Sequence, residues 1–370
     1  MPNTLISVKE LSRTTMLHLQ NNLVFPNLVH KDFSDDFAAH HGDTVQVYKP
    51  VVLEARDFDP SQGVSAQDIA ESTVDVTLDK IASVDVSIEA MQSATNIDDL
   101  NRVFLEPAAI ALAEKINADG LKLYRDVNNF VGTAGTTPAT LGAFAAARKA
   151  LNIQRVPASG RVAVWDPEAD AAFTALDAVV HAEKSGSTQA LREGSIGRVM
   201  AMDHYMSQAV CRHQTGITAA TAVKLSAATQ AGDTTLSLTG TALTGKLVHG
   251  DLMQISGKNY VVTEDTAAAA DNAIASVHVS PALPALAQNT SVTLIGSHTA
   301  NLCFHPLAFA FVTRPLTAPG GVESYVTSYN GISLRVVRGY DMVHKREMLS
   351  MDVLYGFKTL YPELAVRALG

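Results

Sequence analysis

Residues 74–88 read VDVTLDKIASVDVSI and alternate apolar and polar side chains in one register from end to end. At ~3.3 Å per residue, a single strand of this length would extend roughly 50 Å. Its apolar face contains Val74, Val76, Leu78, Ala82, Val84, Val86 and Ile88, with Lys80 as the only polar interruption. Its polar face contains Asp75, Thr77, Asp79, Ser83, Asp85 and Ser87, with Ile81 as the exception.

Such a strand is too long to be paired and covered along its whole length within one compact chain. A chain of 370 residues has a radius of gyration of only ~21 Å when compact, and the average strand has ~5–6 residues. Because a two-stranded ribbon is marginally stable alone, we expect this one to lie on a second copy of the chain. The predicted contact residues are Val74, Val76, Leu78, Asp75, Asp79, Asp85, Lys49 and Arg56. The acidic side chains among them have alternative readings: a solvated outer face, a cation site, or partners for basic residues of a neighbour.

Composition narrows the class of protein. The net charge of -9 argues against a general nucleic-acid binder, which would carry a basic face. Two cysteines, Cys211 and Cys303, cannot make a disulfide framework and fit assembly in a reducing cytoplasm. No segment reads as a signal peptide, and no apolar run reaches the ~20 residues that span a bilayer.

The order of the expected elements indicates an α+β protein with an interrupted body. Residues 1–42 resemble an arm with a short helix at 8–21, and residues 43–90 an extended β-loop whose tip lies around Arg56 to Gln67. Apolar residues at intervals of three or four predict a long helix within 102–129. Residues 138–214 alternate helix and strand, with a helix expected at 167–180 and a strand at 196–202. Short strands spaced along 215–297 predict an inserted β-barrel or sandwich.

No part of the sequence advertises catalysis. Cys211 and His213 lie two residues apart, but a zinc site needs two close ligand pairs, so we interpret His204 and His213 as surface or interface histidines. No serine sits in a nucleophile-elbow context, and no Lys-Ser/Thr pair follows the glycines at 194–197 as a phosphate loop requires. We therefore expect no enzyme, no cofactor and no metal.

Several segments together resemble the major capsid proteins of tailed bacteriophages with the Hong Kong 97-type fold. They are Gly42-Asp43-Thr44-Val45, Leu151-Asn152-Ile153-Gln154-Arg155-Val156-Pro157, Glu193-Gly194-Ser195-Ile196-Gly197-Arg198, Asn301 to Phe311, Ser333 to Asp341, and Asp352 to Arg367. The chain looks closest to the coat proteins of short-tailed Salmonella phages, which also carry an inserted β-domain. The resemblance lies in the order of elements along nearly the whole chain, since no single motif is diagnostic.

The resemblance implies a domain plan. Residues 91–135 and 329–370 would form a peripheral domain with the long helix as its spine. Residues 136–214 and 298–328 would form an axial domain around five- and six-fold axes, and 215–297 the inserted domain. The β-loop would lie over a neighbour's peripheral domain. The insert either steadies its own subunit or contacts a neighbour, and both readings stay open.

The resemblance also implies a function and partners. The chain would self-assemble as hexamers and pentamers into an icosahedral shell around the genome, in the host cytoplasm, and remain in the virion. A scaffolding protein, a portal protein and possibly a decoration protein would be partners, with DNA packaged inside without specific binding and no membrane involved. Because the β-loop begins near residue 43, we expect a separate scaffolding protein rather than a cleaved leader. Some relatives form Lys–Asn cross-links, and although Lys49 and Lys80 lie in the right element, no motif here supports one. A tail-tube or fibre subunit is the first alternative, and an enzyme with an unrecognised site the second.

Overall fold

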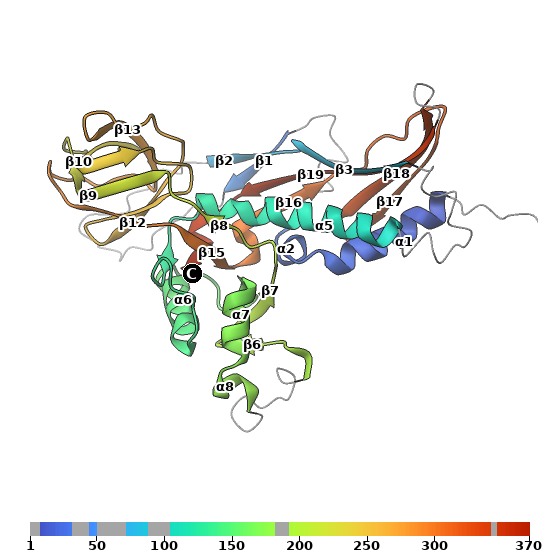
Figure 1. Ribbon diagram of the computed structural model, residues 1–370, viewed down its shortest axis with the longest axis horizontal. Coiled ribbons are helices and arrows are strands. Elements are labelled where there is room, and N and C mark those ends of the chain that lie inside the picture. The colour runs from blue at the N-terminus through green and yellow to red at the C-terminus, as the bar shows by residue number, and fades with distance from the viewer. Residues whose placement is uncertain (1–7, 32–43, 50–71, 88–103, 182–191, 342–345) are drawn as a thin grey trace, which may run out of the picture.

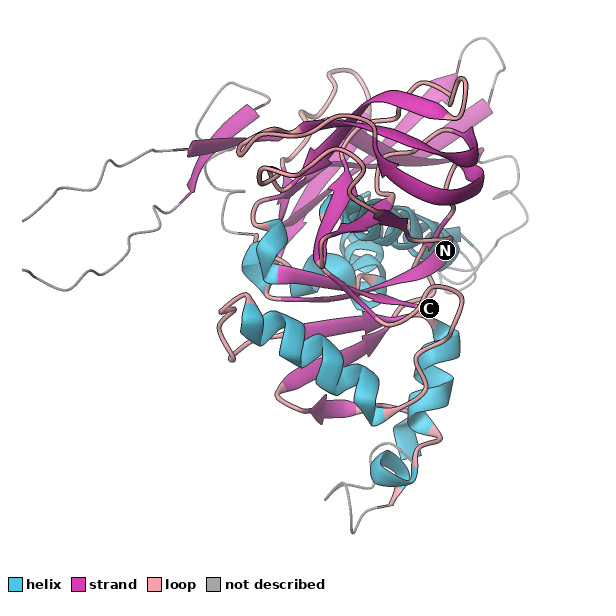
Figure 2. Cartoon of the chain, turned by 90° about the vertical axis from the view of Figure 1, so that its left-hand side faces the viewer, coloured by secondary structure: helices cyan, strands magenta, loops and turns pink. Residues whose placement is uncertain are grey.

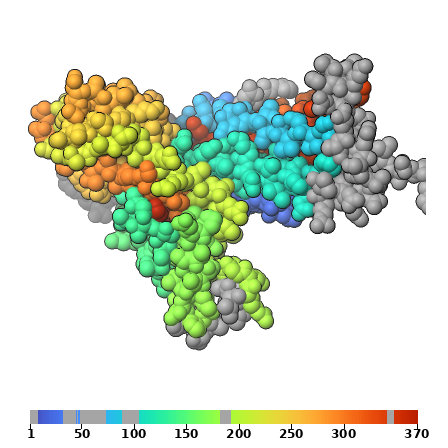
Figure 3. Space-filling view, viewed as in Figure 1, coloured from blue at the N-terminus to red at the C-terminus, as the bar shows by residue number. Residues whose placement is uncertain are grey.

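The computed structural model describes residues 8–31, 44–49, 72–87, 104–181, 192–341 and 346–370. Figure 3 shows three lobes: an elongated body, a rounded lobe at one end of it, and a smaller lobe below their junction. Strand exceeds helix among the described residues, and the α+β class expected from the sequence is confirmed. None of the helices in these ranges is both long and apolar enough to cross a membrane.

The elongated body is built on an antiparallel five-stranded sheet. Its strands are β3 (Lys80–Ser87), β16 (Phe309–Thr313), β17 (Glu323–Tyr329), β18 (Ile332–Asp341) and β19 (Arg346–Thr359). The long strand β19 organises it: β18 pairs with one edge, while β3 and β16 share the other edge end to end. Alternate residues of β19, including Leu349, Met351 and Val353, are buried on the face that helices cover.

Three helices cover that inner face: α1 (Val8–Asn22), α2 (Phe25–Leu28) and α5 (Glu106–Leu121). Pro107 lies in the first turn of α5, and a 3-10 segment, η3 (Lys122–Asp126), continues this helix at its C-terminal end. Phe25 is fully buried, with its ring 5.6–5.9 Å from those of Phe304, Phe309 and Phe357. A Cβ at Gly120 would collide with the Phe25 ring, so only glycine lets α2 approach the spine helix.

A second sheet of seven strands joins the body to the lower lobe. Its strands are β4 (Phe130–Val131), β5 (Val162–Trp165), β6 (Gly197–Val199), β7 (Met202–Met206), β8 (Arg212–His213), β15 (His298–Phe304) and β20 (Ala365–Leu369). Alternation along β5 divides the cores, because Val162 and Val164 pack into the core of the body. Ala163 and Trp165 face the opposite side, where α6 (Leu141–Ile153), α7 (Pro167–Thr174) and α8 (Asp177–Val180) lie.

The rounded lobe is a small six-stranded β-barrel (Figure 1). Its strands are β9 (Ile217–Leu225), β10 (Thr235–Gly245), β11 (Leu252–Ile255), β12 (Lys258–Val262), β13 (Ala273–Ser280) and β14 (Val292–Leu294). A bridge between Lys224 and Ser291 brings the first and last strands together and closes the barrel. The barrel has its own core of buried aliphatic side chains with Tyr260. Closure removes the exposed sheet edges that an open sheet would leave.

The structure corrects three expectations about local elements. The expected strand at 74–88 is two strands, β2 (Ser72–Thr77) and β3, separated by Leu78 and Asp79. The strand expected at 196–202 is the hairpin β6–β7, which turns at Met200 and Ala201. The helix expected at 167–180 is divided into α7 and α8. In each case the apolar pattern was read correctly, but a short break between elements was missed because apolar residues continue across it.

Candidate assembly interface

The expected β-loop begins as a two-stranded ribbon at the margin of the molecule (Figures 1 and 2). Strand β1 (Thr44–Lys49) pairs antiparallel with β2, from Thr44 opposite Thr77 to Lys49 opposite Ser72. Among the described residues, these two strands form a sheet of their own. Residues 50–71, which include the predicted contact residue Arg56, lie outside the described part of the chain.

The inner face of the ribbon packs on its own subunit. Val76 has no exposed surface and lies in one apolar cluster with Val47, Val312 and Leu360. Val74 and Leu78 are half-buried at the margin of the same cluster. Val76 is therefore a packing residue within the chain in this conformation, while a role for Val74 and Leu78 in contacts between subunits stays a prediction.

The outer face of the β-loop has the acidic character that the alternation predicts. Asp75, Asp79 and Asp85 are all exposed, and every odd residue from 73 to 85 is exposed with them. Lys49 ends β1 opposite Ser72. These positions remain predicted contacts with a neighbour.

The second half of the β-loop finds its partner in its own chain. Strand β3 pairs with β19 from Lys80 opposite Tyr355 to Ser87 opposite Met348. The expectation that the whole element lacks a pairing partner in its own chain is therefore wrong for β3. Among the described residues, only the ribbon β1–β2 pairs with no further strand.

Gly356 in β19 explains where the long strand breaks. A Cβ at this position would overlap the carbonyl of Thr77 and lie 3.3 Å from the Cα of Leu78. The backbone between β2 and β3 thus crosses directly over β19 at a residue with no side chain. Since any larger residue would push the crossing chain away, Gly356 fixes the point at which the ribbon leaves the body.

Asp119 ties the base of the β-loop to the spine helix. Its carboxylate is nearly buried, accepts hydrogen bonds from Lys122 at 2.9 Å and Tyr355 at 2.9 Å, and pairs with Lys115 at 3.2 Å and Lys80 at 3.7 Å. Burial acts to raise its pKa, but the hydrogen bonds from Lys122, Tyr355 and Lys115 and the charge of Lys80 together outweigh burial and lower the pKa to about 2. Lys80, the polar interruption of the apolar face, is therefore engaged within its own chain.

A second polar cluster joins the barrel to the body, and we call it the joint. His213, which is buried, donates from Nε2 to the Asp251 carboxylate at 2.8 Å, and its Nδ1 lies 3.0 Å from the hydroxyl of Tyr124. Nearby, His249 lies 3.1 Å from Asp126, which also accepts from Thr359. The barrel residues here precede β11, whereas Tyr124 and Asp126 belong to η3.

Arg367 completes the joint from β20. Its guanidinium is fully buried, donates to the carbonyls of Gly250 at 2.8 Å and Arg125 at 3.1 Å, and lies over the Tyr124 ring at 5.1 Å. Burial lowers its pKa to about 9, which leaves it charged at neutral pH. An apolar contact of Leu252 and Val261 with Leu369 extends the same interface. The barrel is thus fixed to the body by buried charge and apolar packing together.

The side chains of His204, His213 and Cys303, which could act as ligands or catalysts, are buried in the packing of the protein. His204 is buried, accepts a hydrogen bond from the Trp165 indole at 2.9 Å and lies 3.2 Å from the carbonyl of Val199. Of the two expected settings of His204 and His213, surface or interface, the surface alternative is wrong because both side chains are buried. Cys303 is buried and burial raises its pKa to about 12. Within the described ranges no group of His, Cys, Asp and Glu could hold a metal ion.

We compared the sequence with known protein families and curated proteins, and the structure with solved structures. No protein-family model and no curated protein matches the sequence. A solved structure from Mycobacterium phage Che8 is 18% identical, covers 94% of this chain and 90% of its own, and has a TM-score of 0.52. The chain therefore shares the fold of that phage structure.

Two further similar structures have lower scores. The capsid structure of the Cyanophage P-SCSP1u is 13% identical, with 89% of this chain and 83% of that chain covered and a TM-score of 0.48. The capsid of Ralstonia phage GP4 is 11% identical, with 89% and 83% covered and a TM-score of 0.46. Both TM-scores lie below 0.5, so the shared fold rests on the Che8 match.

Proposed function

We propose that this chain is the major capsid protein of a tailed bacteriophage, and that many copies close into an icosahedral shell around the genome. The observation that carries the proposal is the fold shared with a phage structure over 94% of this chain. The sequence resemblance to capsid proteins with the Hong Kong 97-type fold points the same way. In the domain plan that the resemblance implies, α5, β18 and β19 fall within the peripheral domain, and α6, α7 and α8 fall within the axial domain.

The ribbon β1–β2 is the element we propose to reach a neighbouring subunit. Its base is held by Val76 and by the crossing at Gly356, so it leaves the body in a fixed direction. The exposed acidic face of Asp75, Asp79 and Asp85 supplies charge for register. A contact that buries about 400 Å² of apolar area would contribute roughly 10 kcal/mol before ordering costs. Repetition over a closed symmetric shell makes even weaker contacts sufficient.

The inserted barrel, we propose, steadies the subunit that carries it. The joint supports this reading, because His213, Asp251 and Arg367 are buried and bonded within one chain. This organisation agrees with the resemblance to the coat proteins of short-tailed Salmonella phages. A contact of the barrel's outer surface with a neighbour is compatible with the same joint.

Assembly partners follow from the proposed role. A scaffolding protein would guide shell closure in the host cytoplasm, a portal protein would occupy one vertex, and a decoration protein would be an optional addition. The packaged DNA would lie inside the shell without specific recognition, as the net charge of -9 suggests.

The register of the ribbon gives a clean test. Lys49 pairs with Ser72, so replacing residues 50–71 with Asn-Gly would close β1 and β2 into a two-residue hairpin without altering their pairing. We expect a folded monomer that makes no closed shells, examined by negative-stain microscopy of the chain co-expressed with a scaffolding candidate. The control is a variant with Lys224 and Lys258, which are exposed on the barrel, changed to Gln. It keeps the full loop and its acidic face and should still assemble.

Two outcomes would count against the proposal. Shells of normal size and yield from the shortened chain would remove the role of the loop. Open tubes or small rings from the unaltered chain, with no closed particles under any condition, would favour a tail-tube or fibre subunit instead.

A further inference from the structure

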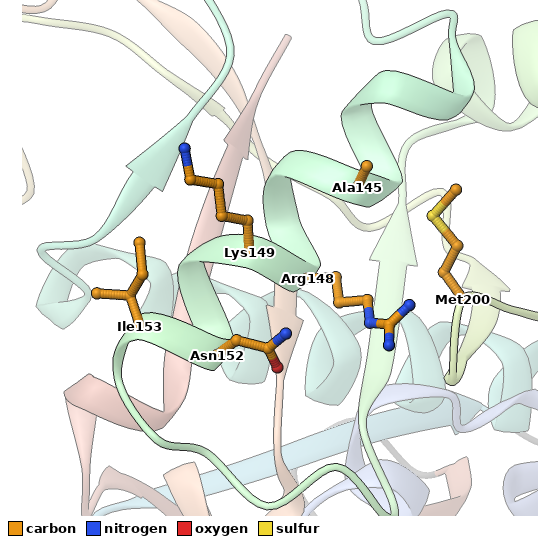
Figure 4. A pocket seen from close by; sticks show the side chains of 6 residues that line it. All are labelled: Ala145, Arg148, Lys149, Asn152, Ile153 and Met200. Atoms are coloured by element: carbon orange, nitrogen blue, oxygen red, sulfur yellow. The ribbon is translucent and has the colours of Figure 1, made fainter.

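An open groove of about 520 Å³ runs along the outer side of α6 (Figure 4). We call it the α6 groove. It is lined by Ala145, Arg148, Lys149, Asn152 and Ile153 of α6, and by Met200 from the β6–β7 turn. Arg148 extends from the helix toward the side on which Met200 lies, while Lys149 and Ile153 extend from its other side.

The walls of the groove carry two large apolar side chains, Ile153 and Met200. Ile153 is 67% exposed, the highest value among the large apolar side chains exposed in the described ranges. Met200 and Ala201 form the turn with φ of 51° and 63°, a left-handed conformation that costs energy for residues other than glycine. A two-residue type I′ turn between paired antiparallel strands requires positive φ at both central residues, and this turn places Met200 in the wall of the groove.

Charge is segregated between the helices of this lobe. From Leu141 to Arg155 the chain carries Arg148, Lys149 and Arg155 and no acidic residue. From Pro167 to Val180 it carries Glu168, Asp170 and Asp177 and no basic residue. Arg148 also adds to burial in lowering the pKa of Arg161, which reports repulsion between neighbouring cations. A carboxylate brought to the groove would relieve that repulsion.

The basic helix α6 and the acidic helices α7 and α8 share one core in the lower lobe, but their outer sides lie on opposite flanks of that lobe. They pack together through Phe144 of α6 and Phe173 of α7, whose ring centroids are 4.2 Å apart, above the same face of the seven-stranded sheet. Figure 1 shows α6 on one flank of the lower lobe, and α7 with α8 on the other. On the outer side of α7, Glu168 and Ala171 are exposed, and small residues there allow another helix to approach closely.

We propose that the α6 groove of one copy receives α7 and α8 of the next copy, with Arg148 and Lys149 against Glu168 and Asp177. The contact joins two different surfaces of the same chain, so each copy offers one groove and one acidic flank. Contacts of this heterologous kind build closed rings when the rotation between copies closes. The inference deepens the proposed function and rests on it, because it names the surfaces by which axial domains meet.

A second copy fits the groove better than a nucleic acid does. Phosphate binding calls for cations alone, whereas this groove also presents Ile153 and Met200, which would be buried only by a partner with apolar surface. The complementary acidic helices are present in the same chain at equal copy number. A polyanion in the groove is an outcome that the test below detects.

A charge-swap series tests the contact. The variant R148E/K149E and the variant E168K/D177K should each fold but assemble at least ten-fold less than the unaltered chain. The quadruple variant that combines them should recover assembly, because every contact again joins opposite charges. The control K224E/K258E makes the same change of net charge as the first variant, at exposed lysines of the barrel, and should assemble normally.

Folding and assembly are measured separately, by Trp165 fluorescence in urea and by sedimentation with microscopy. If the reversal variants prove unfolded, the neutral pair R148Q/K149Q replaces them, with the same ten-fold expectation. Normal shells from folded R148E/K149E, with or without loss of encapsidated nucleic acid, would overturn the inference. So would a folded quadruple variant that fails to assemble. Absence of shells from the unaltered chain would instead contradict the proposed function.

Discussion

Acid should weaken the core between the seven-stranded sheet and helices α6 and α7 through His204. Burial lowers the pKa of this imidazole from 6.5 to about 4. The unfolded chain therefore takes up a proton as the pH falls below 6.5, whereas the folded chain resists protonation until about pH 4. Stability is complete above pH 6.5 and is lost as the pH falls through this window. Between pH 7 and pH 5 only the unfolded imidazole becomes protonated, over roughly 1.5 pH units below 6.5. The free energy of unfolding therefore falls by about 2 kcal/mol.

The only tryptophan of the chain makes the measurement local. Trp165 donates to His204 Nδ1, so its fluorescence in urea reports unfolding of the same core. His204→Gln keeps an acceptor for Trp165 and a donor for the Val199 carbonyl but cannot titrate. We expect this variant to lose about 2 kcal/mol of the pH dependence that the unaltered chain shows. His278→Gln, at an exposed histidine, is the matched control and should change nothing.

Burial also lowers the pKa of His298 and His305, so these groups contribute in the same window, and the comparison of the unaltered chain with His204→Gln isolates the part due to His204. Asp119 has a lowered pKa of about 2, so its contribution is lost only below the ordinary range of a carboxyl near 3.8. His298, whose ring lies 5.3 Å from that of His213 in the joint, has its pKa lowered to about 4 by burial, and it would contribute similarly if the whole chain unfolds as one unit. Equal pH dependence in the unaltered chain and in His204→Gln would refute the reasoning.

Two further substitutions test the joint and the crossing. Arg367→Met should destabilise the joint by about 2–5 kcal/mol, because the buried carbonyl of Gly250 loses its donor. Limited proteolysis should then cut the barrel linkers faster, and an unchanged cleavage rate would contradict this. Gly356→Ala should cost about 2 kcal/mol through its collision with Thr77, seen as faster hydrogen exchange in β3. The control Gly296→Ala, where no atom lies within 4 Å, should leave exchange unchanged.

The alternation of residues 74–88 predicted the faces of the β-loop correctly. Even positions such as Val76 and Ala82 are buried, and odd positions such as Asp75 and Asp85 are exposed. The break at Leu78 was not predictable from the pattern, because the pattern continues across it. What divides the strand is the choice of partner, with β1 on one side and β19 on the other, and the bare backbone at Gly356 that lets the chain cross.

The joint was missed, although one signal was present. Arg367 is the only charged residue in Leu364 to Leu369, an otherwise apolar run that a buried strand requires. A lone arginine in such a run indicates a buried cation that must find acceptors. Its acceptors come from Gly250 and Arg125, far away in sequence. No periodicity within β20 could have identified them, since the contact exists only after the barrel has docked.

This joint also changes how the role of the barrel should be tested. Excising residues 215–297 would remove Asp251 and the Gly250 carbonyl, and would leave His213 with Tyr124 and Arg367 with the Arg125 carbonyl as their remaining partners. It would also expose the apolar side chains of Leu369 and Phe130, which pack against Leu252 and Val261 of the barrel. Exposed apolar surface favours aggregation, so loss of solubility after excision would follow even if the barrel served only to contact neighbours. Substitutions on the exposed surface of the barrel, away from the joint, separate the two roles. If they impair assembly while Trp165 unfolding is unchanged, the barrel acts between subunits as well as within one.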